Sequence, residues 1–193
     1  DRPAGAVSFV YHEGGPASAL DDPQTSDALT RAMADRARSV APVLAEKLEL
    51  GGASLLVDVG GAHGLYSLAL LKKHAELRAV ILDREPPLAV AREYAAAAKL
   101  SDRVELLTCD VHSVKLPAAP EIVLLANLLH DYSAAHAAAL VEHFAAQLAP
   151  GGRLLILDSF LNPQPAGAPP VADGPRAVAA YSALLFSICE GRC

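Results

Sequence analysis

The stretch LLVDVGGAHG at residues 55–64 joins a short apolar run to a cluster of glycines, and a helical pattern follows over residues 65–74. The apolar run has the length of a strand. Glycines allow the backbone to turn tightly, or to approach a ligand closely, before the helix begins. Because a strand, a glycine turn and a helix open a β-α-β unit, the stretch favours an α/β fold with a parallel sheet.

Further apolar runs of strand length alternate with helical stretches along the rest of the chain. The runs cover residues 78–82, 104–107, 122–128 and 153–157, and further helices are expected over residues 87–99 and 133–148. Strands separated by helices require repeated right-handed crossovers. Runs that are apolar throughout are typical of strands covered on both faces. We therefore predict a doubly wound parallel sheet.

The two ends of the chain follow other patterns. Residues 1–23 are rich in Gly, Pro and small polar residues and predict a loosely structured entry segment before a domain over residues 24–193. From Thr25 onwards apolar residues recur at helical spacing, and Pro42 is a candidate break. These apolar residues are Leu29, Met33, Val40, Val43, Leu44 and Leu48. A proline-rich loop is expected over residues 163–175 and a last helix over residues 176–188.

Composition and charge exclude several classes of protein. The chain has 193 residues, of which 52% are hydrophobic and 20% charged, and a formal net charge of −6. A net acidic chain is not expected to bind nucleic acid. The longest apolar stretch is too short to span a bilayer, and three cysteines without zinc-ligand spacing indicate a reducing compartment. We therefore expect a cytoplasmic protein without membrane or metal partners.

Three aspartates lie at the ends of the first three predicted strands, where a doubly wound sheet binds its ligand. Asp58 can face an ammonium group, Asp83 both hydroxyls of a ribose, and Asp110 an exocyclic amine. Each carboxylate could instead cap a helix or form a turn, and the glycine cluster alone fits a tight strand-to-helix turn. Because the glycines at 60, 61 and 64 do not match the dinucleotide fingerprint, a nicotinamide ligand is disfavoured.

These motifs resemble those of class I S-adenosylmethionine-dependent methyltransferases, and especially the plant and bacterial O-methyltransferases that modify small hydroxylated aromatic molecules. The matching stretches are VDVGGAHG (57–64), ILDREPP (81–87), RVELLTCDV (103–111), NLLHDY (127–132) and APGGRLLILDSFL (149–161). The resemblance implies a Rossmann-like sheet with strand order 3-2-1-4-5, S-adenosylmethionine as the cofactor and a small-molecule acceptor.

The resemblance also implies which residues contact the cofactor and the acceptor. Gly60, Gly61 and Gly64 would pass under the amino-acid part of the cofactor, Asp83 would hold its ribose, and Asp110 with Val111 would flank its adenine. Met33 and Asp131 would lie on the acceptor side of the methyl group. Simple packing within a helix is the alternative interpretation of Met33.

His130 corresponds to the general base of this family. A phenol has a pKa near 10, whereas an imidazole with a pKa near 6.5 is neutral at cytoplasmic pH and can accept the proton. Asp158 corresponds to the acid that orients the imidazole. This position is commonly Glu, so the shorter Asp158 is expected to reach further or to act through water. A second acid is expected where the sequence has Gly191-Arg192-Cys193, and a structural role for His130 stays open.

The resemblance further implies parts that precede and follow the sequence. These are an N-terminal helical domain that forms a homodimer and a terminal antiparallel strand pair, so we expect a truncated catalytic domain. Without that pair, the run at 153–157 would be an apolar edge strand prone to association. A degenerate cofactor-binding or regulatory module without turnover is the alternative function.

Overall fold

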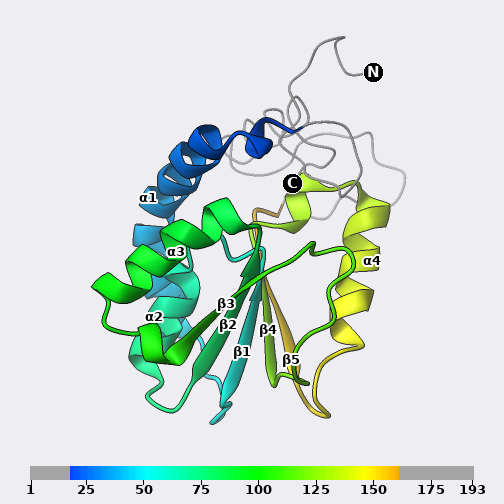
Figure 1. Cartoon of the computed structure of the whole chain (residues 1–193). Helices are drawn as coiled ribbons and strands as arrows, with labels where there is room; N and C mark the ends of the chain where they lie inside the picture. The colour runs from blue at the N-terminus through cyan, green and yellow to red at the C-terminus, as the bar shows by residue number, and fades with distance from the viewer. Residues whose placement is uncertain (1–17, 161–193) are drawn as a thin grey trace.

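The computed structural model describes residues 18–160, which form a parallel sheet between two layers of helices (Figure 1). The strands are β1 (Leu55–Val59), β2 (Arg78–Asp83), β3 (Val104–Thr108), β4 (Ile122–Ala126) and β5 (Arg153–Leu157). The helices are α1 (Pro23–Lys47), α2 (Leu65–Lys73), α3 (Glu85–Ala97) and α4 (Ala134–Ala145), with 3-10 turns η1 (Ala19–Asp21), η2 (Ser101–Arg103) and η3 (Leu129–Asp131). The strand order β3-β2-β1-β4-β5 confirms the predicted topology.

Several predicted segments fall outside the described residues. They are the loop at 163–175, the helix at 176–188, the stretch Gly191-Arg192-Cys193 and most of the entry segment. The last residues of that segment do form defined structure, because Ser18 and Asp21 make a reciprocal capping box around η1. Asp22 then caps α1, which begins at Pro23.

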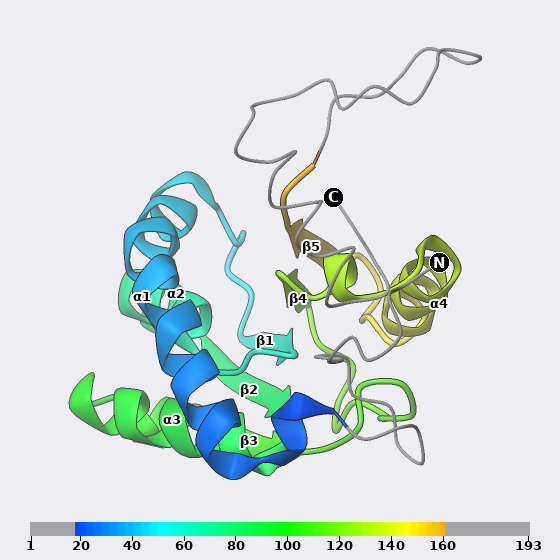
Figure 2. The ribbon, with the colours of Figure 1, turned by 90° about the horizontal axis from the view of Figure 1, so that it is seen from above.

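Two hydrophobic cores lie on opposite faces of the sheet. Helices α1, α2 and α3 cover one face and α4 covers the other, as Figure 2 shows from above the sheet. Because successive side chains of a strand point to opposite faces, Leu56 and Val57 of β1 belong to different cores. Phe144 of α4 is completely buried in the second core.

β4 ends at Ala126, earlier than the predicted residue 128. Asn127 has a φ of 53°, a left-handed conformation that Asn tolerates better than most residues, and it turns the chain away from the sheet. Leu128 then packs into the second core. At the edge of the described sheet, Ile156 of β5 is 40% exposed.

The side of α1 that packs against the sheet domain consists of small residues. Its buried residues are Ser26, Thr30, Ala34, Ala37, Ala41 and Ala45. The predicted apolar face was therefore wrong in part, since Met33 is 42% and Val43 is 53% exposed. Small side chains allow the backbones of packed helices to approach closely, which leaves the larger residues at the margin of the contact.

Pro42 does not break α1. The helix runs without interruption through this position and is 25 residues long in total. A proline in a helix lacks the N–H group that would bond to the carbonyl four residues earlier. Burial of Ala37, Ala41 and Ala45 on both sides of Pro42 holds the helix together. The candidate break is thus overridden by tertiary packing.

We expect Pro42→Ala to raise the free energy of unfolding by about 2 kcal/mol. An interior proline costs about 3 kcal/mol, and its stiffening of the unfolded chain returns up to about 1 kcal/mol. Urea denaturation measures the change. Pro86→Ala is the matched control, because Pro86 lies in the first turn of α3 where the N–H has no partner within the helix. Equal stability of the Pro42→Ala protein and the original chain would contradict the prediction.

Candidate active site

The carboxyl ends of β1 and β4 lie side by side at the point where the winding of the sheet reverses. From β1 the chain continues to β2 and β3 on one side, whereas β4 is followed by β5 on the other. Ligands of open α/β sheets bind at such a switch point. Figure 2 looks onto this edge of the sheet.

The loop from Gly60 to Gly64 is fastened to the end of β2. The backbone N–H groups of Gly60 and Gly61 both donate to the carbonyl of Leu82, over 2.8 and 3.2 Å. Gly60 has a φ of 65°, and a Cβ there would stand 2.8 Å from Cδ1 of Leu128. The loop thus needs glycine for its own packing, and it leads directly into the N-terminus of α2, where backbone N–H groups favour an anionic ligand group.

Asp83 ends β2 and organises the same loop. Its Oδ2 accepts a hydrogen bond from the backbone N–H of Ala62 at 2.9 Å, and its Oδ1 accepts one from the backbone N–H of Arg84 at 2.7 Å. Burial raises the pKa of Asp83, and these two bonds lower it in part. The turn role that was the alternative interpretation is therefore present, and each carboxylate oxygen retains a further lone pair for a ligand hydroxyl.

Asp58 lies completely buried beneath the glycine loop. Its Oδ2 accepts a 2.6 Å hydrogen bond from the Ser67 hydroxyl of α2, whereas its Oδ1 has no hydrogen-bond partner among the described residues. Burial raises the pKa of Asp58 to about 7, the bond from Ser67 lowers it in part, and nearby Asp83 raises it further. A cationic ligand group above the loop would stabilise this buried carboxylate, whose Oδ1 lacks a hydrogen-bond partner among the described residues.

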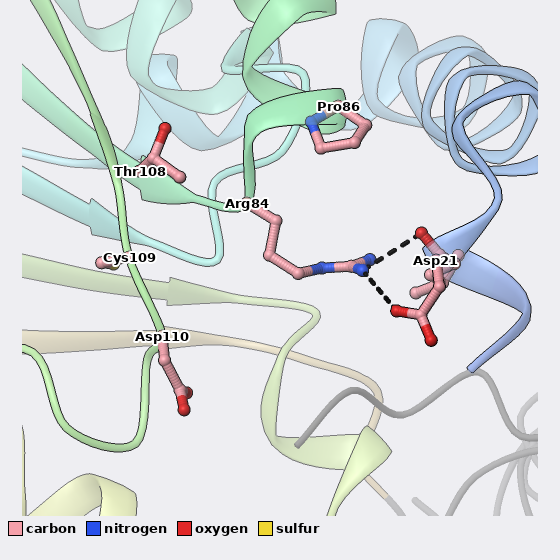
Figure 3. Close-up of a pocket in the computed structure, with 7 residues that line it drawn as sticks. Asp21, Arg84, Pro86, Thr108, Cys109 and Asp110 are labelled. Atoms are coloured by element: carbon pink, nitrogen blue, oxygen red, sulfur yellow. Dashed lines mark hydrogen bonds and ion pairs between the residues drawn. The ribbon is translucent and has the colours of Figure 1, made fainter. Parts of the chain in front are cut away.

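Asp110 lines a pocket beyond the end of β3 (Figure 3). The pocket is lined by Leu20, Asp21, Arg84, Pro86, Thr108, Cys109 and Asp110. Arg84 spans it from β2 to η1, donating to the Leu20 carbonyl at 3.1 Å and lying 3.7 Å from the Asp21 carboxylate. Asp110 Oδ1 accepts from the His112 N–H at 2.9 Å, which is a turn contact, and the neighbouring Val111 packs on the second core.

Sequence reasoning missed the contribution of η1 to this pocket. The signal was available in the pattern Ser18-x-x-Asp21, which is a capping-box signature, followed by Asp22 and Pro23 at a helix start. This capping-box pattern was overlooked because the glycines and prolines that precede it indicate a loosely structured segment.

His130 lies in η3, directly after β4, and is 7% exposed. Its Nδ1 is 2.6 Å from Asp158 Oδ1, and its backbone N–H donates to Asp158 Oδ2 at 3.3 Å. Of the two expectations for the shorter Asp158, that it reaches further or acts through water, the second is wrong, because the 3-10 turn brings His130 into direct contact with this residue after β5. The Nε2 atom lies 3.6 Å from Asp131 Oδ1.

The environment of His130 favours its protonated form. Burial lowers the pKa of the imidazole, but the hydrogen bond to Asp158 and the charges of Asp131 and Asp158 outweigh it, and the net pKa is raised above 6.5. Arg36 acts in the opposite direction and lowers this pKa. The imidazole is thus held by one carboxylate at Nδ1 and faces a second near Nε2.

A second group of residues joins α1, α2 and β4 at the switch point, and the sequence had not indicated it. Asn127 donates from Nδ2 to the Tyr66 hydroxyl at 3.1 Å and accepts from Arg36 Nη2 at 3.3 Å. The only hint in the sequence was that Asn127 interrupts an apolar run. Met33, one helical turn before Arg36, is exposed, so core packing does not explain it.

Residues 18–160 offer neither a metal site nor a membrane-spanning helix. These residues contain no group of three or more His, Cys, Asp and Glu side chains that could hold a metal ion. No helix within them is both long and apolar enough to cross a membrane.

A Rossmann-like parallel sheet of strand order 3-2-1-4-5, with a glycine loop at its carboxyl edge, is the arrangement of a class I methyltransferase. A family model described as the O-methyltransferase domain matches residues 7–173, and the chain belongs to this family. Members of the family use S-adenosylmethionine as the methyl donor.

Two curated relatives and one solved structure illustrate the likeness. Mitomycin biosynthesis 6-O-methyltransferase of Streptomyces lavendulae is 30% identical over 146 residues, which are 76% of this chain and 42% of that protein. L-tyrosine C(3)-methyltransferase of the same organism is 29% identical over 186 residues, 96% of this chain and 47% of that protein. An O-methyltransferase family 2 protein from Planctomyces limnophilus, crystallised with apigenin, superposes with a TM-score of 0.82 at 35% identity, covering 92% of this chain and 53% of that one. The chain therefore spans less than half the length of these two curated relatives.

We expect Asp58→Asn to stabilise the protein, and to do so more strongly at high pH. A carboxyl whose pKa rises from 3.8 to about 7 on folding binds its proton more tightly in the folded state, so its ionisation destabilises the fold as pH rises from about 4 to 7. The stability advantage of the Asn variant should grow by about 2 to 3 kcal/mol between pH 5 and pH 8.

Urea denaturation at the two pH values measures this difference. Asp102→Asn is the control, because Asp102 lies in the exposed turn η2. A stability advantage of the Asp58→Asn protein that does not change with pH would show that Asp58 is ionised at no cost.

Proposed function

We propose that this chain carries the catalytic site of an S-adenosylmethionine-dependent O-methyltransferase that methylates a hydroxyl group of a small aromatic molecule, with His130 as the general base. The observation that carries the proposal is the 2.6 Å contact between His130 Nδ1 and Asp158 Oδ1 at the switch point. Because this contact holds a proton on Nδ1, the neutral imidazole presents its lone pair at Nε2.

The glycine loop and the three aspartates form the proposed cofactor site. S-adenosylmethionine supplies, when bound, a methyl group activated by a sulfonium. The residues assigned to hold it are Gly60, Gly61 and Gly64 at its amino-acid part, Asp83 at its ribose, and Asp110 with Val111 at its adenine. Asp58 favours the ammonium group from beneath the loop through its charge, and its orphaned Oδ1 supports this role.

The role of His130 follows from the difference between two pKa values. A phenol ionises near pH 10, so its proton must pass to a base as the oxygen attacks, and His130 Nε2 accepts it. Asp158 stabilises the imidazolium that forms through its 2.6 Å contact at Nδ1, and Asp131 adds a second negative charge 3.6 Å from Nε2. Much of the remaining acceleration comes from holding the reacting groups together.

The acceptor is proposed to be an aromatic molecule because of the relatives. The Planctomyces protein is crystallised with apigenin, and other relatives carry names such as 3-amino-4-hydroxybenzoate 4-O-methyltransferase of Streptomyces cremeus. One relative is named as a C-methyltransferase acting on L-tyrosine. A base that removes a phenolic proton activates the oxygen directly, so we assign transfer to oxygen. Met33, exposed on α1, and Asp131 are proposed to lie on the acceptor side.

Two properties of the whole protein belong to the same proposal. A homodimer is inferred from the family resemblance, and a cytoplasmic location from the three cysteines without zinc-ligand spacing. The alternative of a cofactor-binding module without turnover predicts binding of the cofactor with no transfer. The direct His130–Asp158 contact favours the enzyme.

S-adenosylhomocysteine should bind to this chain more tightly than NAD, and Asp83→Ala should weaken that binding by about 1 to 3 kcal/mol. The variant removes a charged partner of the ligand hydroxyls. Calorimetry on both proteins measures the affinities, thermal melting checks the fold, and Asp102→Ala serves as the matched control. Equal affinity for NAD, or normal binding by the Asp83→Ala protein, would contradict the cofactor assignment.

His130→Gln should reduce kcat by about 100-fold to 10,000-fold while the affinity for S-adenosylhomocysteine stays unchanged, because the base contributes in the transition state. Turnover with phenolic acceptors, followed by mass spectrometry, measures the loss.

The pH dependence of turnover is a second measurement of the role of His130. Activity should fall as His130 becomes protonated at low pH, and Asp158→Asn should move this fall to lower pH because Asp158 raises the pKa of His130. Near-normal turnover by the His130→Gln protein would place the base elsewhere.

A further inference from the structure

Arg36 of α1 is placed at the carboxyl end of β4. Its Nη2 lies 3.3 Å from Asn127 Oδ1, across 91 residues of sequence. Asn127 immediately follows β4 and leads into the turn that carries His130. A cation from the first helix therefore stands beside the turn that contains the proposed base.

Asn127 holds this contact in a fixed position. Its backbone N–H donates to the Leu157 carbonyl at 2.7 Å, which ties it to the end of β5, and its Nδ2 donates to Tyr66 at 3.1 Å. With the amide nitrogen turned to Tyr66, the amide oxygen faces Arg36. The Arg36 side chain is exposed, but its guanidinium is held in position by its hydrogen bond to Asn127, which is itself bonded to the end of β5.

The other two arginines of α1 face α3 instead. Arg31 pairs with Asp27 and with Glu93 of α3, both at 3.0 Å. Arg38 pairs with Asp35 and stands 5.3 Å from the ring centroid of Tyr94. The position of Arg36 at β4 is therefore not a general property of the arginines on this helix.

Three charged side chains act on the His130 imidazole from three elements. Asp158 after β5 and Asp131 of η3 are negative and raise its pKa, whereas Arg36 of α1 is positive and lowers it. An acceptor that carries an anion would be repelled on the side of the two carboxylates and attracted on the side of α1. The charge pattern thus favours one orientation of such an acceptor.

We infer that Arg36 is a specificity-determining residue that recognises a carboxylate on the aromatic acceptor whose hydroxyl group is directed to His130. The inference rests on the proposed function. A planar guanidinium matches the two oxygens of a carboxylate better than any other side chain. Met33, one turn earlier on α1 and 42% exposed, offers an apolar contact to the ring of the same molecule.

The test compares acids with their neutral esters. Binding of a panel of hydroxybenzoates and hydroxynaphthoates, each paired with its methyl ester, is measured by calorimetry on the full chain in the presence of S-adenosylhomocysteine. The original chain should prefer each bound acid over its ester. Arg36→Ala should weaken binding of the acids by about tenfold to 100-fold and leave the esters unchanged. Arg36→Lys should recover part of the loss, because lysine keeps the positive charge but lacks the planar set of donors that binds both carboxylate oxygens.

Arg31→Ala is the matched control, since it removes the same charge from the same helix at a site that faces α3. Three results would overturn the inference: no preference for acids in the original chain, an equal loss for acids and esters in Arg36→Ala, or the same selective loss in Arg31→Ala. Failure of the proposed function is seen separately, as absent binding of S-adenosylhomocysteine or absent methylation of every acceptor. A chain that methylates neutral phenols without acid preference would contradict the role of Arg36 alone.

Discussion

Parallel pairing of β1 with both β2 and β4 is the constraint on which the site depends. The register aligns Val59 with Leu82 on one side and with Leu125 on the other, so the three strands end together. Gly60 and Gly61 can therefore reach the Leu82 carbonyl, and the turn after β4 stands next to the glycine loop. A register shift of one residue would move the Asp58 side chain to the opposite face of the sheet, away from Ser67.

The His–Asp pair depends on the next pairing along the sheet. β4 and β5 end in register at Ala126 and Leu157, and the N–H of Asn127 extends this ladder by bonding to the Leu157 carbonyl. The left-handed turn at Asn127 then folds η3 back over the end of β5. This geometry explains why an aspartate is long enough to meet the imidazole, and it makes a strained backbone residue part of the support of His130.

Helix α1 packs against the domain through one face and carries Met33 and Arg36, the residues with proposed roles, on another. Alanines at positions 37, 41 and 45 allow it to lie close to α2, which fixes the height and direction of the helix over the sheet. The face that remains at the margin carries Met33 and Arg36, and close packing brings Arg36 within reach of Asn127. Packing by small residues on one face thus sets the position of Met33 and Arg36 on another.

Buried carboxylates lower the stability of the fold at this site when they are ionised. Asp58 and Asp83 lie beneath and beside the glycine loop with pKa values raised by burial. Groups of this kind oppose folding when ionised, and they are stabilised by a positively charged or hydroxyl-bearing ligand. A ligand bound at the glycine loop, as proposed, would therefore also stabilise the fold.

The sequence by itself determined the five strands and their alternation with helices, because strands covered on both faces are apolar throughout, as the fully buried residues 122–126 are. Motif order also indicated the strand order and which residues, among them His130 and Asp158, would meet at the carboxyl edge. Only the tertiary structure decided how they meet. The complete burial of Asp58, the direct bond of His130 to Asp158, the exposure of Met33 and the reach of Arg36 to Asn127 all depend on contacts between distant segments. Such contacts are set by how closely α1 packs and where the chain turns after β4, and local residue patterns do not encode these distances.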